Sequence, residues 1–233
     1  MRKSGINLLS WLLLGGVFVL LACTVDVSFR QLVHSVISFP MFRDAAVSLF
    51  RVVVPLAVVW VLSIILGYLF WFFPSINRLC GPTLHFLRGI PPMAWLPFTI
   101  LWFGIGEVPL FAVMMLTLLF PGIVGSHGAF CAVPREYHEE GVVCGSSAWQ
   151  LFWWVELPLS LVAQLQSLRL LWGLGWGTLV AGEMLGVQSG LGFRLLDFRY
   201  LLRYGEMLVV LGFMGTLVLG VDVLLRAVIR RVE

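Results

Sequence analysis

Long apolar stretches alternate with short polar segments along this chain. A helix needs about 20 mostly apolar residues to cross a lipid bilayer. Six stretches meet or approach that length: Ser4 to Val25, Val52 to Asn77, Gly89 to Gly106, Val108 to Pro134, Leu157 to Gly182 and Met207 to Val221. The pattern therefore predicts an all-α integral membrane bundle of about six transmembrane helices, forming one domain over residues 1–233.

Composition supports a membrane protein and argues against several other classes. The chain is 60% hydrophobic and 12% charged, whereas an ordinary soluble domain is about 45–50% apolar and about 25% charged. The basic residues are scattered, so no stripe could follow a nucleic-acid backbone. The four cysteines lie far apart without a CxxC pair, which argues against a disulfide framework or a metal site.

The first apolar stretch allows two interpretations. Arg2 and Lys3 precede it, and it ends at Leu21, Ala22 and Cys23. That arrangement fits a secretory signal that is cleaved, with Cys23 as the lipidated residue. It fits a retained transmembrane helix equally well in length. The following apolar stretches place the rest of the chain in the membrane under either interpretation.

The charges between the stretches indicate an orientation. With six spans both termini lie on one side of the membrane, and segments rich in Lys and Arg favour the cytoplasm. If the termini are cytoplasmic, eight basic residues lie inside, Arg88 among them, and six outside, Arg51 among them. This excess is small, and it favours a multi-pass protein of a bacterial-type inner membrane with both termini cytoplasmic.

Residues 135–158 carry the longest run of clustered charge, and they predict two short helices joined by a sharp turn. Pro134 suits a helix start, where its missing amide proton costs nothing. Gly145 can adopt the left-handed backbone that ends a helix, and Ser146 or Ser147 can cap the next one. One face of that second helix is expected to carry Trp149, Phe152, Trp153 and Glu156.

This segment resembles the EAA loop of ABC importer permeases: Glu-Ala-Ala, three residues, glycine, nine residues and Ile-x-Leu-Pro. The positions that match are Glu139, Gly145, Val155, Leu157 and Pro158. Glu140 and Gly141 stand where the pattern has alanines, although some branches of the family have glycine at the third place. The resemblance implies that the matching residues, together with Gly141, couple the chain to an ATPase subunit.

Further motifs resemble the permeases for nitrate, taurine, alkanesulfonates and bicarbonate. They are Leu87 to Pro97, Leu101 to Glu107, the set Arg169, Gly173, Trp176, Thr178 and Glu183, and Ser189 to Gly192. The resemblance implies a permease core over residues 46–228 after a variable segment, 1–45. It also implies a second permease copy, two ATPase subunits that bind ATP and magnesium, an external binding protein, and alternating access for a small anion or small organic molecule.

Four residues in the fifth stretch or directly after it are candidates for the pathway or the bundle interior: Arg169, Trp176, Thr178 and Glu183. Arg169 would cost about 2.5–3.5 kcal/mol at the centre of a span. It could reach the inner boundary, or it could be paired inside the bundle, where an arginine in the pathway would suit an anionic substrate. The glycines around it suit close helix packing, and flexibility for gating is the alternative.

Other functions fit the sequence less well. The only lysine is Lys3, so the chain lacks the glycine-rich loop with lysine that holds ATP phosphates. We therefore expect no cofactor and no ATP hydrolysis in this chain. Ser126 and His127 could suggest a serine hydrolase, but neighbours on a helix point in different directions, and no nucleophile-elbow motif is present. A stand-alone channel or secondary transporter is the alternative transport class.

Overall fold

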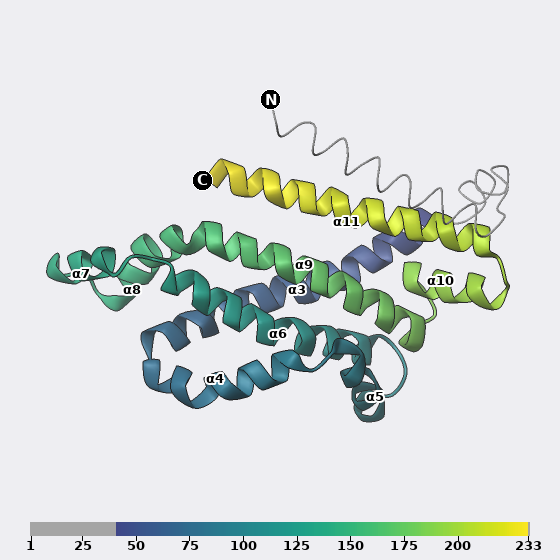
Figure 1. Ribbon diagram of the computed structural model, residues 1–233, viewed down its shortest axis with the longest axis horizontal. Helices are drawn as coiled ribbons and strands as arrows, with labels where there is room; N and C mark the ends of the chain where they lie inside the picture. Colours follow the sequence, from purple (N-terminus) through teal and green to yellow (C-terminus); the bar gives the residue numbers. More distant parts are fainter. Residues whose placement is uncertain (1–40, 233) are drawn as a thin grey trace.

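The computed structural model describes residues 41–232, which form helices and contain no strand (Figure 1). The all-α prediction is confirmed for this part of the chain. The helices are α3 (Met41–Phe72), α4 (Pro74–Gly89), α5 (Pro92–Phe103), α6 (Glu107–Cys131), α7 (Arg135–Val143), α8 (Ala148–Leu151), α9 (Leu157–Gly186), α10 (Leu191–Tyr200) and α11 (Tyr204–Val232), with a π-helical turn at Phe152–Glu156 between α8 and α9.

The bundle is built around α3, α6 and α9, which pack against one another along much of their length. Figure 1 shows α7 and α8 projecting at one end, and α5 and α10 at the other. Helix α4 leaves the α7–α8 end and runs beside α6, while α11 returns along α9 toward that end. Two ends are therefore defined: the hairpin end, with α7 and α8, and the opposite end, with α5 and α10.

The hydrophobic core lies where the three central helices meet. Each contributes side chains that are almost completely buried: Val52 and Val59 from α3, Val113, Met114 and Leu118 from α6, and Leu171, Trp172 and Leu179 from α9. Because lipid is itself apolar, close packing rather than water exclusion must hold such helices together. Small residues at the helix crossings are therefore expected.

Helices α3 and α6 cross at a contact made by small residues. A Cβ atom added to Gly122 would lie 2.2 Å from the Ser63 hydroxyl oxygen, and one added to Gly67 would lie 2.6 Å from that of Ser126. Real Cβ contacts are never so short. Glycine at these two positions is what allows the two helix backbones to approach.

We expect Gly122→Val to lower the thermal stability of the purified protein, because the added side chain overlaps Ser63 and forces α3 and α6 apart. The expected loss is about 1–3 kcal/mol, measured as the midpoint temperature for loss of the monodisperse peak in detergent. Gly220→Val is the control, since no described atom lies within 4 Å of a Cβ there. Equal midpoints for the two variants would contradict the crossing.

Three helices are individually long and apolar enough to span a membrane: α3, α6 and α11. Helix α9, continued from α8 and bent by 51° against α10, makes a fourth. These agree with the expected spans that begin at Val52, Val108, Leu157 and Met207. The span expected from Ser4 to Val25 lies outside the described residues.

The span predicted from Gly89 to Gly106 is wrong as a single helix. Helix α5 has only 12 residues, about 18 Å of helix, whereas the hydrocarbon core is about 30 Å thick. A new helix starts at two adjacent prolines: Pro91 is the N-cap of α5, and Pro92 is its first residue. Gly104, with φ of 77°, is its C-cap, and Gly106, with φ of 146°, is the N-cap of α6. The return leg beside α6 is therefore divided between α4 and α5.

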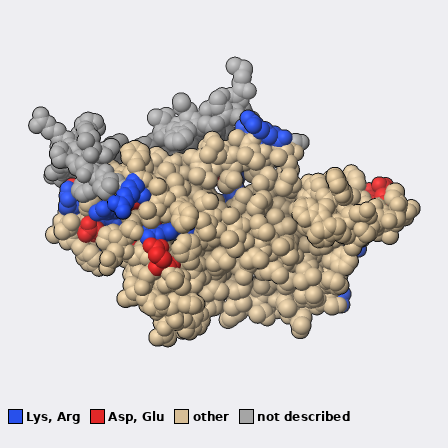
Figure 2. Space-filling view, turned by 180° about the vertical axis from the view of Figure 1, so that it is seen from behind, with Lys and Arg blue, Asp and Glu red and all other residues tan. Residues whose placement is uncertain are grey.

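The distribution of charge agrees with a membrane-embedded middle. Figure 2 shows most charged residues of that face gathered toward the end with α10, and acidic residues at the tip of the hairpin end. Between them lies a broad surface without charged side chains. Among the described residues, apolar side chains such as Leu101, Leu170 and Ile65 are more than half exposed, as expected for a protein whose surface faces lipid or another chain.

Candidate functional site

Residues 135–158 form a helical hairpin in which α7 and α8 are joined by a tight turn. Gly145 has φ of 80°, the left-handed backbone expected from the sequence. Ser147 is the residue that caps α8: its hydroxyl accepts from the Gln150 amide, and the Gln150 side chain accepts from the Ser147 amide at 2.8 Å. Pro134 caps α7 and is not its first residue. The turn is thus fixed by backbone conformation and by reciprocal capping.

The two arms of the hairpin touch at two points. A Cβ added to Gly141 would lie 2.3 Å from a methyl carbon of the buried Leu151, which explains a glycine where the EAA pattern has alanine. His138 Nδ1 lies 2.6 Å from the buried Glu156 Oε1, joining α7 to the π-helical turn. These contacts fix α7 relative to α8 and the π-helical turn.

The hairpin is attached to the bundle through Phe152. Its ring lies 4.5 Å from Tyr68 of α3 and 6.3 Å from Phe130 of α6, measured between ring centroids. The predicted aromatic face is confirmed for Trp149, Phe152 and Trp153, although a π-helical turn follows α8: the ring centroids of Trp149 and Phe152 lie 6.2 Å apart, those of Trp149 and Trp153 5.6 Å, and those of Phe152 and Trp153 5.2 Å. Glu156, the fourth residue of the prediction, contacts His138 of α7. Phe152 and Glu156 are buried, whereas Trp149 and Trp153 are exposed.

The outer surface of the hairpin is acidic and aromatic. Glu139 is exposed on α7 beside two further exposed carboxylates, Glu136 and Glu140. Large apolar side chains exposed on the same hairpin are Tyr137, Val142, Val143, Trp149, Trp153 and Trp154. Val155 and Leu157 are partly buried, and Pro158 is exposed at the second position of α9. An exposed apolar cluster with polar neighbours is typical of a protein contact surface.

Arg169 is partly exposed and is paired with an acidic residue of another helix. Its guanidinium donates two hydrogen bonds to Asp222 of α11, and Asp222 also contacts Arg226 at 2.7 Å. The partner lies 53 residues away in the sequence, so the spacing pattern on α9 gave no sign of it. This ion pair attaches α11 to α9.

The other candidates on α9 lie in the bundle interior. Trp176 is buried with its ring centroid 5.6 Å from that of Trp172. Thr178 is buried and its hydroxyl donates to the Leu174 carbonyl at 2.9 Å. Glu183 is completely buried. The geometry thus gives these three residues contacts within the helix bundle.

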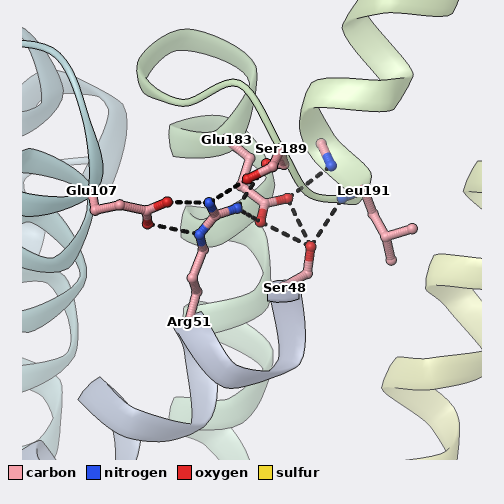
Figure 3. A network of polar contacts seen from close by, with 7 residues as sticks. Ser48, Arg51, Glu107, Glu183, Ser189 and Leu191 are labelled. Atoms are coloured by element: carbon pink, nitrogen blue, oxygen red, sulfur yellow. Dashed lines mark hydrogen bonds and ion pairs between the residues drawn. The ribbon is translucent and has the colours of Figure 1, made fainter. Parts of the chain in front are cut away.

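Glu183 belongs to a buried network that joins four segments near the end with α10 (Figure 3). Arg51 of α3 donates to Glu183 at 2.9 Å, to both carboxylate oxygens of Glu107 on α6, and to the carbonyl and hydroxyl oxygens of Ser189. Ser48 donates to Glu183 at 2.8 Å and accepts from the Leu191 amide. Every N–H direction of the Arg51 guanidinium is therefore used.

Two glycines at the start of α10, the N-cap Gly190 and Gly192, leave room for the same network. A Cβ on Gly190 would lie 2.2 Å from a Glu183 carboxylate oxygen, and φ there is 103°. A Cβ on Gly192 would lie 2.7 Å from the Val180 carbonyl oxygen, and the Gly192 amide donates to Glu183 at 2.8 Å. The sequence analysis counted Arg51 among the outer residues and Glu183 among the candidates for the pathway or the bundle interior, and it did not bring the two together.

A cavity of about 840 Å³ opens between α4, α5, α6 and α9. It was not predicted. Its wall contains one charged side chain among the described residues, Arg88, together with Thr117, Gln166 and Ser167 as polar groups. Arg88 was assigned to an inner segment because a span was expected to begin right after it. The pair Pro91–Pro92, which divides that span, was the signal that could have corrected the assignment.

The glycines of α9 fall into two groups. A Cβ added to Gly175 would lie 3.2 Å from a methyl carbon of Val52, and a Cβ added to Gly182 would lie 2.3 Å from a methyl carbon of Leu110. For Gly173 and Gly177 no described atom lies within 4 Å of an added Cβ. Close packing inside the chain therefore explains only part of the set, and the open glycines face the side on which the cavity opens.

The described residues do not arrange a hydrolytic or metal site. Ser126 is buried at the α3–α6 crossing, whereas the ring of His127 contacts Asn77 at 3.3 Å and the Cys131 sulfur. The two side chains thus contact different partners. Within residues 41–232, no group of three or more His, Cys, Asp or Glu side chains could hold a metal ion.

Comparisons with known proteins agree with this architecture. The methionine ABC transporter MetNI, solved in inward-facing conformations, superposes with a TM-score of 0.75 at 20% sequence identity, covering 83% of this chain and 96% of that chain. The taurine transport system permease protein TauC of Escherichia coli is 31% identical over 153 residues, which is 66% of this chain but only 56% of TauC. A probable ABC transporter permease of Brucella melitensis is 31% identical over 235 residues, 97% of this chain and 95% of that protein.

The family match covers most of the described bundle, including the hairpin, the cavity wall, and Glu107, Glu183 and Ser189 of the buried network; Ser48 and Arg51 lie before the matched range. Residues 59–233 match the family described as the binding-protein-dependent transport system inner membrane component. This range is well over half of the 233-residue chain. The chain belongs to the family of binding-protein-dependent transport system inner membrane components.

Proposed function

We propose that the chain is the transmembrane subunit of an ATP-driven importer and that two copies of it form the translocation pathway. Two cytoplasmic ATPase subunits supply the energy, and an external binding protein delivers a small anion or small organic molecule. The hairpin of α7 and α8 carries this proposal: it projects from the bundle, its outer face is exposed, and His138–Glu156 and Phe152 fix its base.

The hairpin supports force transmission because it is rigid at the base and uncovered at the tip. A short helix that exposes aromatic and acidic side chains can lie in a groove of a partner protein. The contact of Phe152 with Tyr68 and Phe130 would pass a movement of that helix directly to α3 and α6. The chain itself has no lysine-containing phosphate loop, so ATP hydrolysis is assigned to the partner.

A second copy of the chain fits the side on which the cavity opens. Gly173 and Gly177 leave that side of α9 open, and Leu170 is 73% exposed. Small residues allow a neighbouring helix to approach closely in a membrane. The hairpin lies on the cytoplasmic side in this proposal, and the end of α11, with Arg230 and Arg231, lies on the same side (Figure 1), in agreement with the preference of basic residues for the cytoplasm.

The test is purification of the tagged full-length chain from its native host in mild detergent, with identification of co-purifying proteins by mass spectrometry. We expect an ATPase to co-purify with the unmodified chain. Glu139→Lys reverses one of three neighbouring exposed charges on α7 and should reduce ATPase recovery about tenfold, the effect of roughly 1.4 kcal/mol at a contact.

Asp197→Lys on α10 is the matched control, because it reverses a charge at the opposite end of the bundle. It should leave ATPase recovery unchanged. Recovery of the unmodified chain without any ATPase, under conditions that keep a known ABC importer of the same host intact, would contradict the proposal and favour a channel or secondary transporter.

A further inference from the structure

The cavity between α4, α5, α6 and α9 has one charged side chain in its described wall, Arg88. We propose that Arg88 is the residue of the translocation pathway that binds the negatively charged group of a small anionic substrate. This inference rests on the proposed importer function and adds to it the chemical class of the substrate and the residue that recognises it. The cavity, about 840 Å³, is in the range of small-molecule sites, about 300–1,000 Å³.

Arg88 differs from Arg51 and Arg169 in its ion pairs. Arg51 is paired with Glu107 and Glu183, and Arg169 with Asp222. Arg88 has no acidic partner among residues 41–232. An arginine inside a membrane that is neither paired nor at the boundary is a candidate for a substrate pathway.

Arg88 is an exposed residue that lies well away from the hairpin end along α4. It lies 14 residues after Pro74, where α4 leaves the hairpin end, so about 21 Å of helix separate the two. Arg88 is in the last turn of α4, where the helix dipole favours a cation by about 0.3–1 kcal/mol. That gain is smaller than the cost of about 2.5–3.5 kcal/mol for an arginine at the centre of a span, so the dipole alone does not account for it.

The neighbouring groups suit an anion. Thr117 lines the same cavity, and its hydroxyl oxygen is buried without a hydrogen-bond partner. Gln166 is exposed in the wall and offers an amide, and no carboxylate lines the cavity among the described residues. A guanidinium presents paired N–H groups that match the two oxygens of a carboxylate, sulfonate or nitrate. Positive charge and donors thus converge without a competing anion of the protein.

The test measures the charge preference of the cavity and does not require the natural substrate. The four native cysteines are first replaced by serine, and Gln166→Cys then introduces one thiol in the cavity wall. The complex with its co-purified ATPase is treated with two methanethiosulfonate reagents of similar size, the anionic sulfonatoethyl and the cationic trimethylammonioethyl compound. The ratio of the two modification rates is the readout.

We expect the thiol at position 166 to favour the anionic reagent, because Arg88 lines the same cavity. Arg88→Gln should lower the anionic-to-cationic rate ratio about tenfold, since a cavity lined by charge of one sign raises the local concentration of counter-ions by about 10-fold or more. Arg88→Lys keeps the charge and should retain most of the ratio. A control thiol from Val143→Cys, on the 87% exposed tip of the hairpin, should show no effect of either Arg88 variant.

An unchanged ratio in Arg88→Gln would overturn the proposal, and so would a thiol at position 166 that neither reagent reaches with or without ATP. These failures differ from failure of the importer function, which is seen as absence of the ATPase from the unmodified complex before any reagent is added. Purification of Arg88→Gln with its full complement of ATPase would show that the variant is folded and assembled.

Discussion

Arg51→Met is expected to destabilise the folded protein by about 3–5 kcal/mol, because it leaves a buried carboxylate without its cation. Glu183 is fully buried and would keep only the Ser48 hydroxyl and the Gly192 amide as donors. In the unmodified protein, the Arg51 guanidinium balances the negative charge of Glu183. The measurement is a denaturant titration of the purified protein in detergent, followed by circular dichroism.

The double variant Arg51→Met with Glu183→Gln separates this cause from a general loss of packing. Glutamine keeps the shape of Glu183 but carries no charge, so the double variant should recover more than half of the lost stability. Arg194→Met is the matched control, because it removes an arginine from an ion pair that is more exposed. The Arg194 and Asp44 side chains are 29% and 9% exposed, whereas those of Arg51 and Glu183 are 3% and 0% exposed. A loss for Arg51→Met no larger than for Arg194→Met would show that the network does not hold the helices together.

The network also shows what a single sequence can and cannot reveal. The apolar stretches were sufficient to predict the helices α3, α6, α9 and α11, since length and hydropathy are local properties. The partners of buried charges were not predictable in the same way. Arg51 and Glu183 are 132 residues apart, and Arg169 and Asp222 are 53 apart. Such pairs are set by the packing of helices, which a spacing pattern within one helix does not describe.

Local backbone chemistry was predicted more accurately than burial. Gly145 and Ser147 adopt the turn and cap that their residue types favour, because these preferences act over three or four residues. The aromatic face after Ser147 was also predicted, since the rings of Trp149, Phe152 and Trp153 contact one another. The π-helical turn at Phe152–Glu156 was not predicted, and neither was the burial within that face, where Phe152 is buried while Trp153 is exposed.

Arg88 illustrates a different limit. Its charge and its neighbours Gly89 and Pro91 gave the appearance of a polar connection before a span. In the structure, α4 continues to Gly89 and the break follows at Pro91, so the arginine lies deep along the return leg. A chain that divides one crossing between two helices cannot be read by hydropathy alone, since neither half reaches the required length.

Gly145→Val is expected to abolish ATPase recovery with the purified chain while leaving the stability of the bundle nearly unchanged. A β-branched residue is strongly disfavoured at φ of 80°, so the turn between α7 and α8 must change and the two helices lose their relative orientation. No described atom lies within 4 Å of a Cβ at position 145, so the effect comes from backbone conformation and not from a clash. Co-purification and the thermal midpoint of the same sample are the two measurements.

A second variant, Gly145→Asn, separates the effect of backbone conformation from that of side-chain size. Asparagine adopts the left-handed conformation more readily than other non-glycine residues. Gly145→Asn should therefore retain most of the ATPase, although its side chain is about as large as that of valine. Gly215→Val on α11, where an added Cβ also has no described neighbour within 4 Å, should retain all of it. If Gly145→Val keeps its ATPase, the left-handed turn is not what presents Glu139 and the exposed aromatic side chains to the partner; if Gly145→Asn loses it as completely as Gly145→Val, the requirement at this position is for the absence of a side chain at the contact.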